Sequence, residues 1–119
     1  MNGAVIVFGS LGEARLESFE IPPLASDEVL VESAFSVISA GTEVANLKQL
    51  PNTVSFEHGF PHYPGYCGAG TVIDIGGQVE KLSVGDRVII QWGGHRSHVV
   101  KKAEDIVKIE NDAIDLLEA

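Results

Sequence analysis

Short apolar runs, broken at close intervals by Gly, Pro and Asp, restrict the fold of this chain more than any other feature. Runs rich in Val and Ile, or alternating between apolar and polar residues, are typical of β-strands, and turn residues at this spacing favour a barrel or sandwich over a βαβ fold. The pattern predicts an opening hairpin and then a series of further strands, over residues 4–8, 16–21, 28–38, 70–75, 87–92, 97–101 and 103–109.

One interior segment has helical periodicity instead. Val44, Leu47 and Leu50 recur at helical spacing, Thr42 is placed to serve as the N-cap, and Glu43 is favourable at the first helical position. The following segment, 51–65, carries three prolines and two histidines with little periodicity. We therefore expect one short helix followed by an ordered surface loop.

Size and charge narrow the class of protein. A chain of 119 residues, 45% of them hydrophobic, predicts a single compact domain. The formal net charge of −9, with no basic cluster beyond Lys101 and Lys102, disfavours nucleic-acid binding. No apolar run approaches the ~20 residues that span a bilayer, so we expect no membrane partner and a cytoplasmic location. The single Cys67 cannot form an internal disulfide.

Three local motifs, taken together in this order and spacing, resemble the medium-chain dehydrogenase/reductase family. Ser-Ala-Gly-Thr-Glu at 39–43 falls where zinc alcohol dehydrogenases have a cysteine, one further residue, threonine or serine, and an acidic residue. Pro-Gly-Tyr-Cys-Gly-Ala-Gly-Thr-Val at 64–72 is similar to the family's Gly-His-Glu segment, and Val-Gly-Asp-Arg-Val at 84–88 to its glycine turn. The resemblance implies the family's N-terminal domain: a mainly β, GroES-like, partly open β-barrel with one short helix.

The chain departs from this family at the zinc ligands. Ala40 stands where the family has cysteine, Tyr66 replaces the histidine and Cys67 the glutamate. The lobe that holds a structural zinc in many members is replaced by a short turn at 93–97. We therefore expect no metal site.

The resemblance also implies a function. Residues 1–119 correspond to the substrate domain, which holds a carbonyl, alcohol or activated alkene against NAD(P), while a Rossmann domain beyond Ala119 binds the coenzyme. The last ten residues begin a helical pattern and stop, so we expect the chain to be truncated before that domain, which would be its missing partner. Exposed barrel edges allow a homo-oligomer. No cofactor binding and no activity are expected of this chain alone.

Three residues are candidates for the site by the same resemblance. Thr42 matches the residue that relays a proton from the substrate oxygen, Trp92 matches an aromatic of the substrate pocket, and Tyr66 stands in the cleft where a metal ligand would be. A phenol there is a candidate general acid. N-capping explains Thr42 almost as well, and Tyr66 is also consistent with a packed aromatic residue. The residues that bind the coenzyme are not identified.

Two other classes of function stay open. The chain is also consistent with a self-sufficient GroES-like binding module that uses the barrel and the 51–65 loop without catalysis. The four histidines allow a structural zinc protein, but His95 and His98 lie three apart across a turn into a strand and are poorly placed to chelate one ion.

Overall fold

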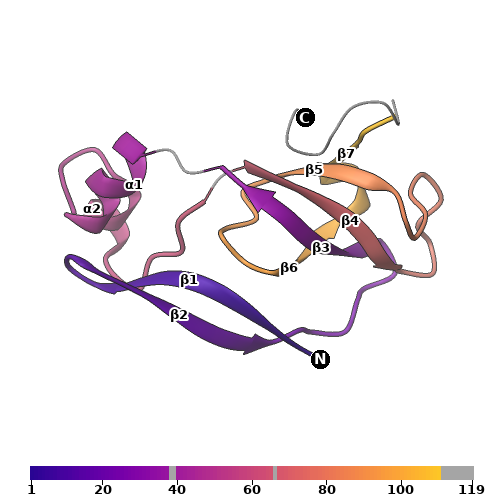
Figure 1. The fold of residues 1–119 in the computed structure, drawn as a ribbon, viewed down its shortest axis with the longest axis horizontal. Coiled ribbons are helices and arrows are strands. Elements are labelled where there is room, and N and C mark those ends of the chain that lie inside the picture. Colours follow the sequence, from indigo (N-terminus) through magenta and orange to yellow (C-terminus); the bar gives the residue numbers. More distant parts are fainter. Residues whose placement is uncertain (38–39, 66, 111–119) are drawn as a thin grey trace.

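The chain folds into a two-stranded hairpin and a five-stranded sheet that curl around a common interior (Figure 1). The structure is a computed structural model and describes residues 1–37, 40–65 and 67–110. The hairpin pairs β1 (Asn2–Ser10) with β2 (Glu13–Glu20). All strand pairs of the five-stranded sheet are antiparallel, in the order β6-β3-β4-β5-β7. These strands are β3 (Glu28–Ser36), β4 (Cys67–Ile75), β5 (Arg87–Gln91), β6 (His98–Lys102) and β7 (Ile106–Lys108), with a single 3-10 turn at Ala103–Asp105.

The core of the sheet consists of β-branched side chains on alternate strand positions. Val29 and Val31 on β3, Val72 on β4, and Val88 and Ile90 on β5 are all almost fully buried. Period-two alternation places these residues on one face of the sheet, where burial supplies most of the stabilisation. The predicted strands are confirmed with two corrections: residues 103–105 form a 3-10 turn, so that β7 is shorter than predicted, and β5 ends before Trp92. The mainly β, half-barrel class of fold is confirmed.

Two glycines of β4 let neighbouring strands approach closely. A Cβ added at Gly68 would lie 2.7 Å from the carbonyl oxygen of Phe35, and one at Gly70 would overlap the carbonyl oxygen of Glu32. Glycine is therefore required by the close contact of β3 with β4.

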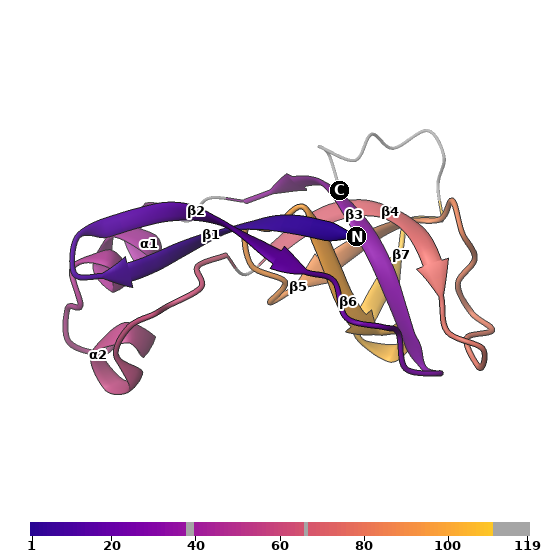
Figure 2. The same cartoon turned by 90° about the horizontal axis from the view of Figure 1, so that it is seen from below.

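The hairpin closes the barrel by pairing β1 with segments far away in the chain. The backbone amide of Ile6 donates to the carbonyl oxygen of His95 at 2.8 Å, and that of Ser97 to the carbonyl oxygen of Ala4 at 2.8 Å. Further along β1, Phe8 and His62 exchange two backbone hydrogen bonds of 2.7 and 2.9 Å. Figure 1 shows the hairpin beneath the helices and the sheet, and Figure 2, seen from below, shows it passing in front of α1.

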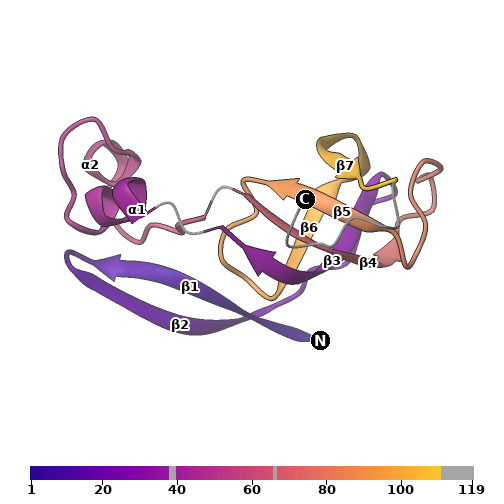
Figure 3. The same cartoon turned by 45° about the horizontal axis from the view of Figure 1, so that its top comes forward.

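Two short helices, α1 (Ala40–Leu47) and α2 (Val54–His58), lie beyond one end of the five-stranded sheet (Figure 3). Buried polar groups join them. Asn46 Oδ1 accepts from the backbone amide of Ser55 at 3.0 Å, and Ser55 Oγ donates to the carbonyl oxygen of Asn46 at 2.6 Å. No helix in the described ranges is long and apolar enough to span a bilayer.

The helical region corrects two expectations. Thr42 is not an N-cap, because α1 begins two residues earlier, where Ala40 has a higher helix propensity than threonine. The helix also ends before Leu50, since Gln49 adopts a left-handed backbone with φ 55°. The 51–65 segment is not loop throughout: it contains α2, whose N-cap is Thr53. The helical pattern expected over the last ten residues lies almost wholly outside the described ranges.

Candidate functional site

The site residues predicted from the sequence do not gather in one pocket of the described structure. Thr42 is exposed on α1, and its backbone carbonyl accepts a hydrogen bond of 2.9 Å from Asn46 Nδ2. Trp92 follows β5 with its side chain 75% exposed and a left-handed backbone at φ 59°. Tyr66 lies outside the described residues. The roles assigned to these three residues therefore stay predictions.

Trp92 does line a pocket, of about 390 Å³, on the outer side of β6 and the turn before it. Arg96 in its wall lies over the ring of Phe19, with the guanidinium carbon 5.4 Å from the ring centroid. Thr42 does not contribute to this pocket. Its lining consists of Phe19, Pro22, Glu28, Trp92, Gly93, Arg96, His98, Val99, Val100 and Lys101.

The described residues do not fit a zinc ion at the family's ligand positions. Alanine at position 40 offers no donor atom, and Cys67 is a half-buried free thiol at the start of β4. No group of three His, Cys, Asp or Glu side chains suited to a metal occurs in the part of the chain that the structure describes. The histidines have separate partners: His98 Nε2 lies 3.9 Å from Glu32, and the exposed His58 lies 4.0 Å from Glu57.

A hydrogen-bonded polar cluster joins β3, α1 and the turn before β6. His95 Nδ1 lies 2.6 Å from Ser36 Oγ, and His95 Nε2 is in direct contact with Glu43 Oε1. The side chains of His95 and Glu43 are 7% and 14% exposed, whereas Ser36 is exposed. We call Ser36, His95 and Glu43 the relay cluster. It joins a hydroxyl, an imidazole and a carboxylate in one hydrogen-bonded series.

Three separate segments contribute the members of the relay cluster. Ser36 ends β3 and pairs in register with Gly68, directly after Cys67. Glu43 lies one helical turn after position 40 on α1, and side chains at this spacing share a helix face. His95 lies in the segment that closes the barrel against β1. The acid, the imidazole and the hydroxyl thus meet where three parts of the fold converge.

Glu43 has one oxygen that the cluster does not satisfy. Glu43 Oε2 is buried and has no hydrogen-bond partner among the described residues. Buried polar atoms in folded proteins are nearly always paired, because an unpaired one costs its full desolvation energy.

His62 is a second imidazole within the electrostatic reach of Glu43. It packs against Phe8, with ring centroids 5.9 Å apart. Burial lowers the pKa of His62 below its ordinary value of 6.5, and the negative charge of Glu43 opposes this by favouring the protonated form. Because desolvation is the larger cause, His62 is mainly neutral near neutral pH.

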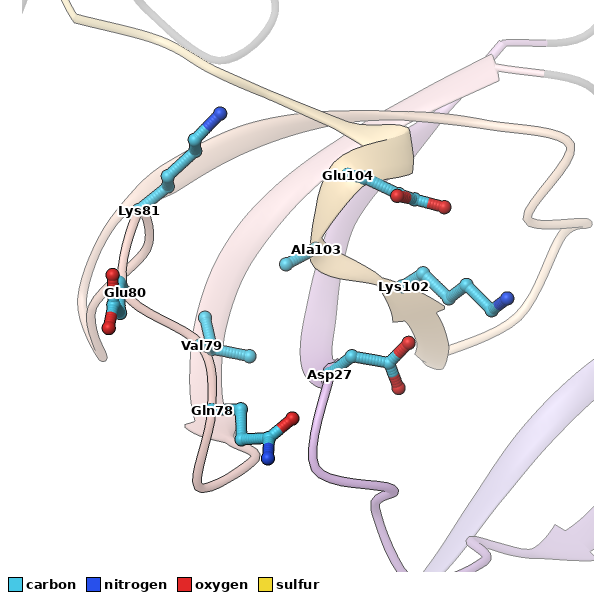
Figure 4. Close-up of a pocket in the computed structure, with 8 residues that line it drawn as sticks. All are labelled: Asp27, Gln78, Val79, Glu80, Lys81, Lys102, Ala103 and Glu104. Carbon is cyan, nitrogen blue, oxygen red and sulfur yellow. The ribbon is translucent and has the colours of Figure 1, made fainter.

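A different pocket, of about 270 Å³, lies at the opposite end of the five-stranded sheet. The register Glu28↔Lys102 marks that end, while Ser36↔Gly68 marks the end with the relay cluster. Figure 4 shows acidic and basic side chains on both sides of this pocket, with two apolar side chains between them. Charges of both signs compensate each other there and favour no one class of ligand. The lining residues are Asp27, Gln78, Val79, Glu80, Lys81, Lys102, Ala103 and Glu104.

Sequence reasoning missed the relay cluster. The sequence predicts Ser36 as part of a strand and Glu43 as an acid in the first turn of a helix. It indicates His95 only as a poor candidate for metal binding. The hydrogen bonds of His95 bridge sequence separations of 59 and 52 residues, which no local pattern reveals. The one available signal was an acid three residues after the alanine that replaces the zinc cysteine.

Comparison with known proteins identifies the family. Residues 25–112 match the model of the alcohol dehydrogenase GroES-like domain. A sorbitol dehydrogenase of Bombyx mori is 32% identical over 98 residues, which are 76% of this chain and 25% of that protein. Among solved structures, a putative NADPH:quinone reductase of Bacillus thuringiensis is 26% identical with a TM-score of 0.80, and covers 98% of this chain and 36% of its own.

A second enzyme structure agrees with these matches. The mitochondrial 2-enoyl thioester reductase heterodimer of Candida tropicalis is 28% identical with a TM-score of 0.75, over 95% of this chain and 35% of its own. The chain spans only about a quarter to a third of the length of these relatives. It belongs to the alcohol dehydrogenase GroES-like family, the N-terminal domain of medium-chain dehydrogenases/reductases.

Proposed function

We propose that this chain is the substrate domain of a zinc-independent, NAD(P)-dependent oxidoreductase, which transfers hydride to or from a carbonyl, an alcohol or an activated alkene. The family assignment supports an oxidoreductase. The names of three relatives cover an alcohol, a quinone and an enoyl thioester, and one of them names NADPH. The relatives therefore support the reaction class and leave the substrate open within it.

The relay cluster is the observation that carries the zinc-independent part of the proposal. A hydroxyl, an imidazole and a carboxylate form the cluster, and its Glu43 lies three residues after position 40, where an alanine replaces the family's cysteine ligand. Hydrogen-bond donors held in place beside a reacting oxygen stabilise developing charge without a metal. The relay cluster would thus supply the hydrogen-bond donors that stabilise charge on the substrate oxygen in place of zinc.

The coenzyme belongs to a part of the enzyme outside this chain. When bound there, the nicotinamide supplies or accepts the hydride. The chain's own contribution is to bind the substrate, orient its reacting carbon and exclude water. Because proximity to the hydride donor provides much of the rate, we expect the 119-residue chain alone to be inactive.

The test is an activity assay on the complete polypeptide encoded by the gene. Consumption of NADH and NADPH is followed optically with a ketone, a quinone and a 2-enoyl thioester, and the metal content is measured in parallel. We expect turnover with at least one substrate in preparations that hold less than stoichiometric zinc and that keep their rate in the presence of a chelator. Turnover that depends on bound zinc would contradict zinc independence, and no turnover with any substrate would contradict the oxidoreductase assignment.

The predicted roles of Tyr66 and Thr42 are tested in the same polypeptide. Loss of the phenol hydroxyl in Tyr66→Phe should lower kcat if Tyr66 donates a proton, and Thr42→Val should do so if its hydroxyl relays one. Unchanged turnover in either variant would remove that residue from the proposed chemistry. Asn2→Ala, an exposed substitution at the start of β1, is the control.

A further inference from the structure

The relay cluster has the form of a path for protons. Each ring nitrogen of His95 has one partner: Ser36 Oγ on Nδ1, at 2.6 Å, and Glu43 on Nε2. An imidazole that holds a hydroxyl on one nitrogen and a carboxylate on the other is arranged to exchange a proton with the hydroxyl, while the carboxylate stabilises its charged form.

The hydroxyl is the most exposed member of the series. Ser36 is exposed at the end of β3, while the side chains of His95 and Glu43 are 7% and 14% exposed. The series therefore runs from an exposed residue, through a buried imidazole, to a half-buried carboxylate.

A purely structural role accounts poorly for this arrangement. Burying a histidine and a glutamate side by side costs desolvation energy, and an apolar pair of similar volume would usually serve stability as well or better. The buried Glu43 Oε2 adds to that cost, because it has no hydrogen-bond partner in the described part of the chain. A role in proton transfer would account for the buried pair of His95 and Glu43.

We propose that Ser36, His95 and Glu43 form a proton-transfer chain for the hydride-transfer reaction, with the Ser36 hydroxyl as the group that exchanges a proton with the substrate. This inference rests on the proposed function, which supplies the reaction and the reduced coenzyme. It assigns Ser36 as a catalytic residue and Glu43 as a positioning residue that acts through His95.

The step balances with proton movements alone once hydride has reached the substrate. Hydride brings its electron pair to the carbonyl carbon, and the oxygen becomes negatively charged. The Ser36 O–H bond breaks as its proton bonds to that oxygen, and Ser36 Oγ takes the Nδ1 proton of the His95 imidazolium. His95 is left neutral. It keeps its other proton on Nε2, and this N–H donates a hydrogen bond to the Glu43 carboxylate. Oxidation of an alcohol runs the same transfers backwards.

Among the described residues, the charged neighbours of His95 include Arg96, which follows it in the chain. Glu43 faces His95 from α1, and Ser36 contributes an uncharged hydroxyl from β3. His62, on the loop before β4, is the other titratable group that the charge of Glu43 reaches. Any pH profile measured for the relay cluster therefore needs His62→Asn beside it, to separate the two imidazoles.

The first experiment reads the hydrogen bonds directly on the 119-residue chain. Nitrogen NMR of the imidazole rings follows how fast the two ring protons of His95 exchange with water. We expect both to be protected in the wild type, Ser36→Ala to speed exchange mainly at Nδ1, and Glu43→Gln to perturb mainly Nε2. His58→Gln and Glu57→Gln, which alter the exposed pair, should change neither. Unprotected ring protons, or no response to Ser36→Ala, would overturn the proposal.

The second experiment measures turnover in the complete polypeptide. Ser36→Ala and His95→Gln should each lower kcat by about 100-fold or more with little change in KM, and should reduce the solvent deuterium isotope effect. Added imidazole should restore part of the rate to His95→Ala but none to Ser36→Ala. A merely structural role would not produce this selective rescue.

The outcomes separate the relay from the proposed function. If the wild type turns over but Ser36→Ala and His95→Gln keep its kcat and pH profile, the proton-transfer chain is wrong and the oxidoreductase stands. If the wild type shows no turnover with any substrate, the proposed function fails and the relay fails with it, whatever the NMR spectra show.

Discussion

The five-stranded sheet and the helical end of this molecule are held together in opposite ways. The sheet packs Val and Ile side chains against one another, with Val29, Val31 and Val88 fully buried. The helical end, made of α1, α2 and the loop to β4, buries polar groups, namely Asn46, Ser55 and, beside them, the Glu43–His95 pair. Apolar packing tolerates many sequences, whereas buried polar groups require particular partners. The sheet therefore depends on apolar packing, and the helical end depends on specific polar contacts.

The largest effect should come from removing apolar volume in the sheet. Ile90→Ala deletes a side chain that is 2% exposed in the core cluster, and we expect the free energy of unfolding to fall by about 2–5 kcal/mol. Denaturant unfolding measures it. Val107→Ala on the exposed face of β7 is the control, and should cost about 0.5 kcal/mol or less. A loss at Ile90 as small as that at Val107 would contradict the apolar description of the sheet.

A smaller loss is expected from a buried amide at the helical end. Asn46→Ala removes the acceptor for the Ser55 amide and the donor to the Thr42 carbonyl, and should lower the free energy of unfolding by about 1–3 kcal/mol. The exposed Asn2→Ala is the matched control. If Asn46→Ala unfolds like the control, polar contacts do not hold the two helices together.

Sensitivity to pH should belong to the helical end. Burial holds the pKa of His62 below its ordinary 6.5, so the unfolded chain binds this proton at higher pH than the folded chain. The contribution of His62 to stability is therefore complete above pH 6.5, falls as the pH drops below it, and levels off once folded His62 is protonated. Thermal unfolding of His62→Asn across this range should show a flatter acid limb than the wild type. His58→Asn should keep the wild-type slope, and equal slopes in all three proteins would contradict the effect.

The smallest effect is predicted for an ion pair with the same chemistry as the relay cluster but on the surface. Glu57 and His58 are 69% and 74% exposed and lie 4.0 Å apart. Water and salt screen such pairs, so Glu57→Gln should change the free energy of unfolding by no more than about 0.5 kcal/mol. Glu43→Gln, measured by the same denaturant unfolding, should change it by more. Equal effects would mean that burial does not distinguish the two pairs.

Most of the sheet could be predicted because its information is local. Alternation between apolar and polar residues, together with the turn residues between the runs, predicts the strands. The helices were harder. α2 has five residues, too few for a periodic signal, and Thr42 has the chemistry of an N-cap although helix α1 starts at Ala40.

The candidate site was the least predictable part, because it depends on tertiary contacts. The motif that led to the family also placed Glu43 beside the lost zinc position, but nothing near Glu43 in the sequence points to His95, which lies 52 residues away. Only the closure of the barrel brings the imidazole to the carboxylate.

That closure has a consequence for control of the site. The residue that carries the imidazole is hydrogen-bonded through its own carbonyl to Ile6 of the hairpin, and Ser97 to Ala4. Local unfolding of β1 would then also disrupt the relay cluster. Hydrogen exchange at the backbone amide of Ile6 would report this unfolding. An antibody fragment or peptide that displaces the hairpin would therefore inhibit the proposed proton transfer without competing with the substrate.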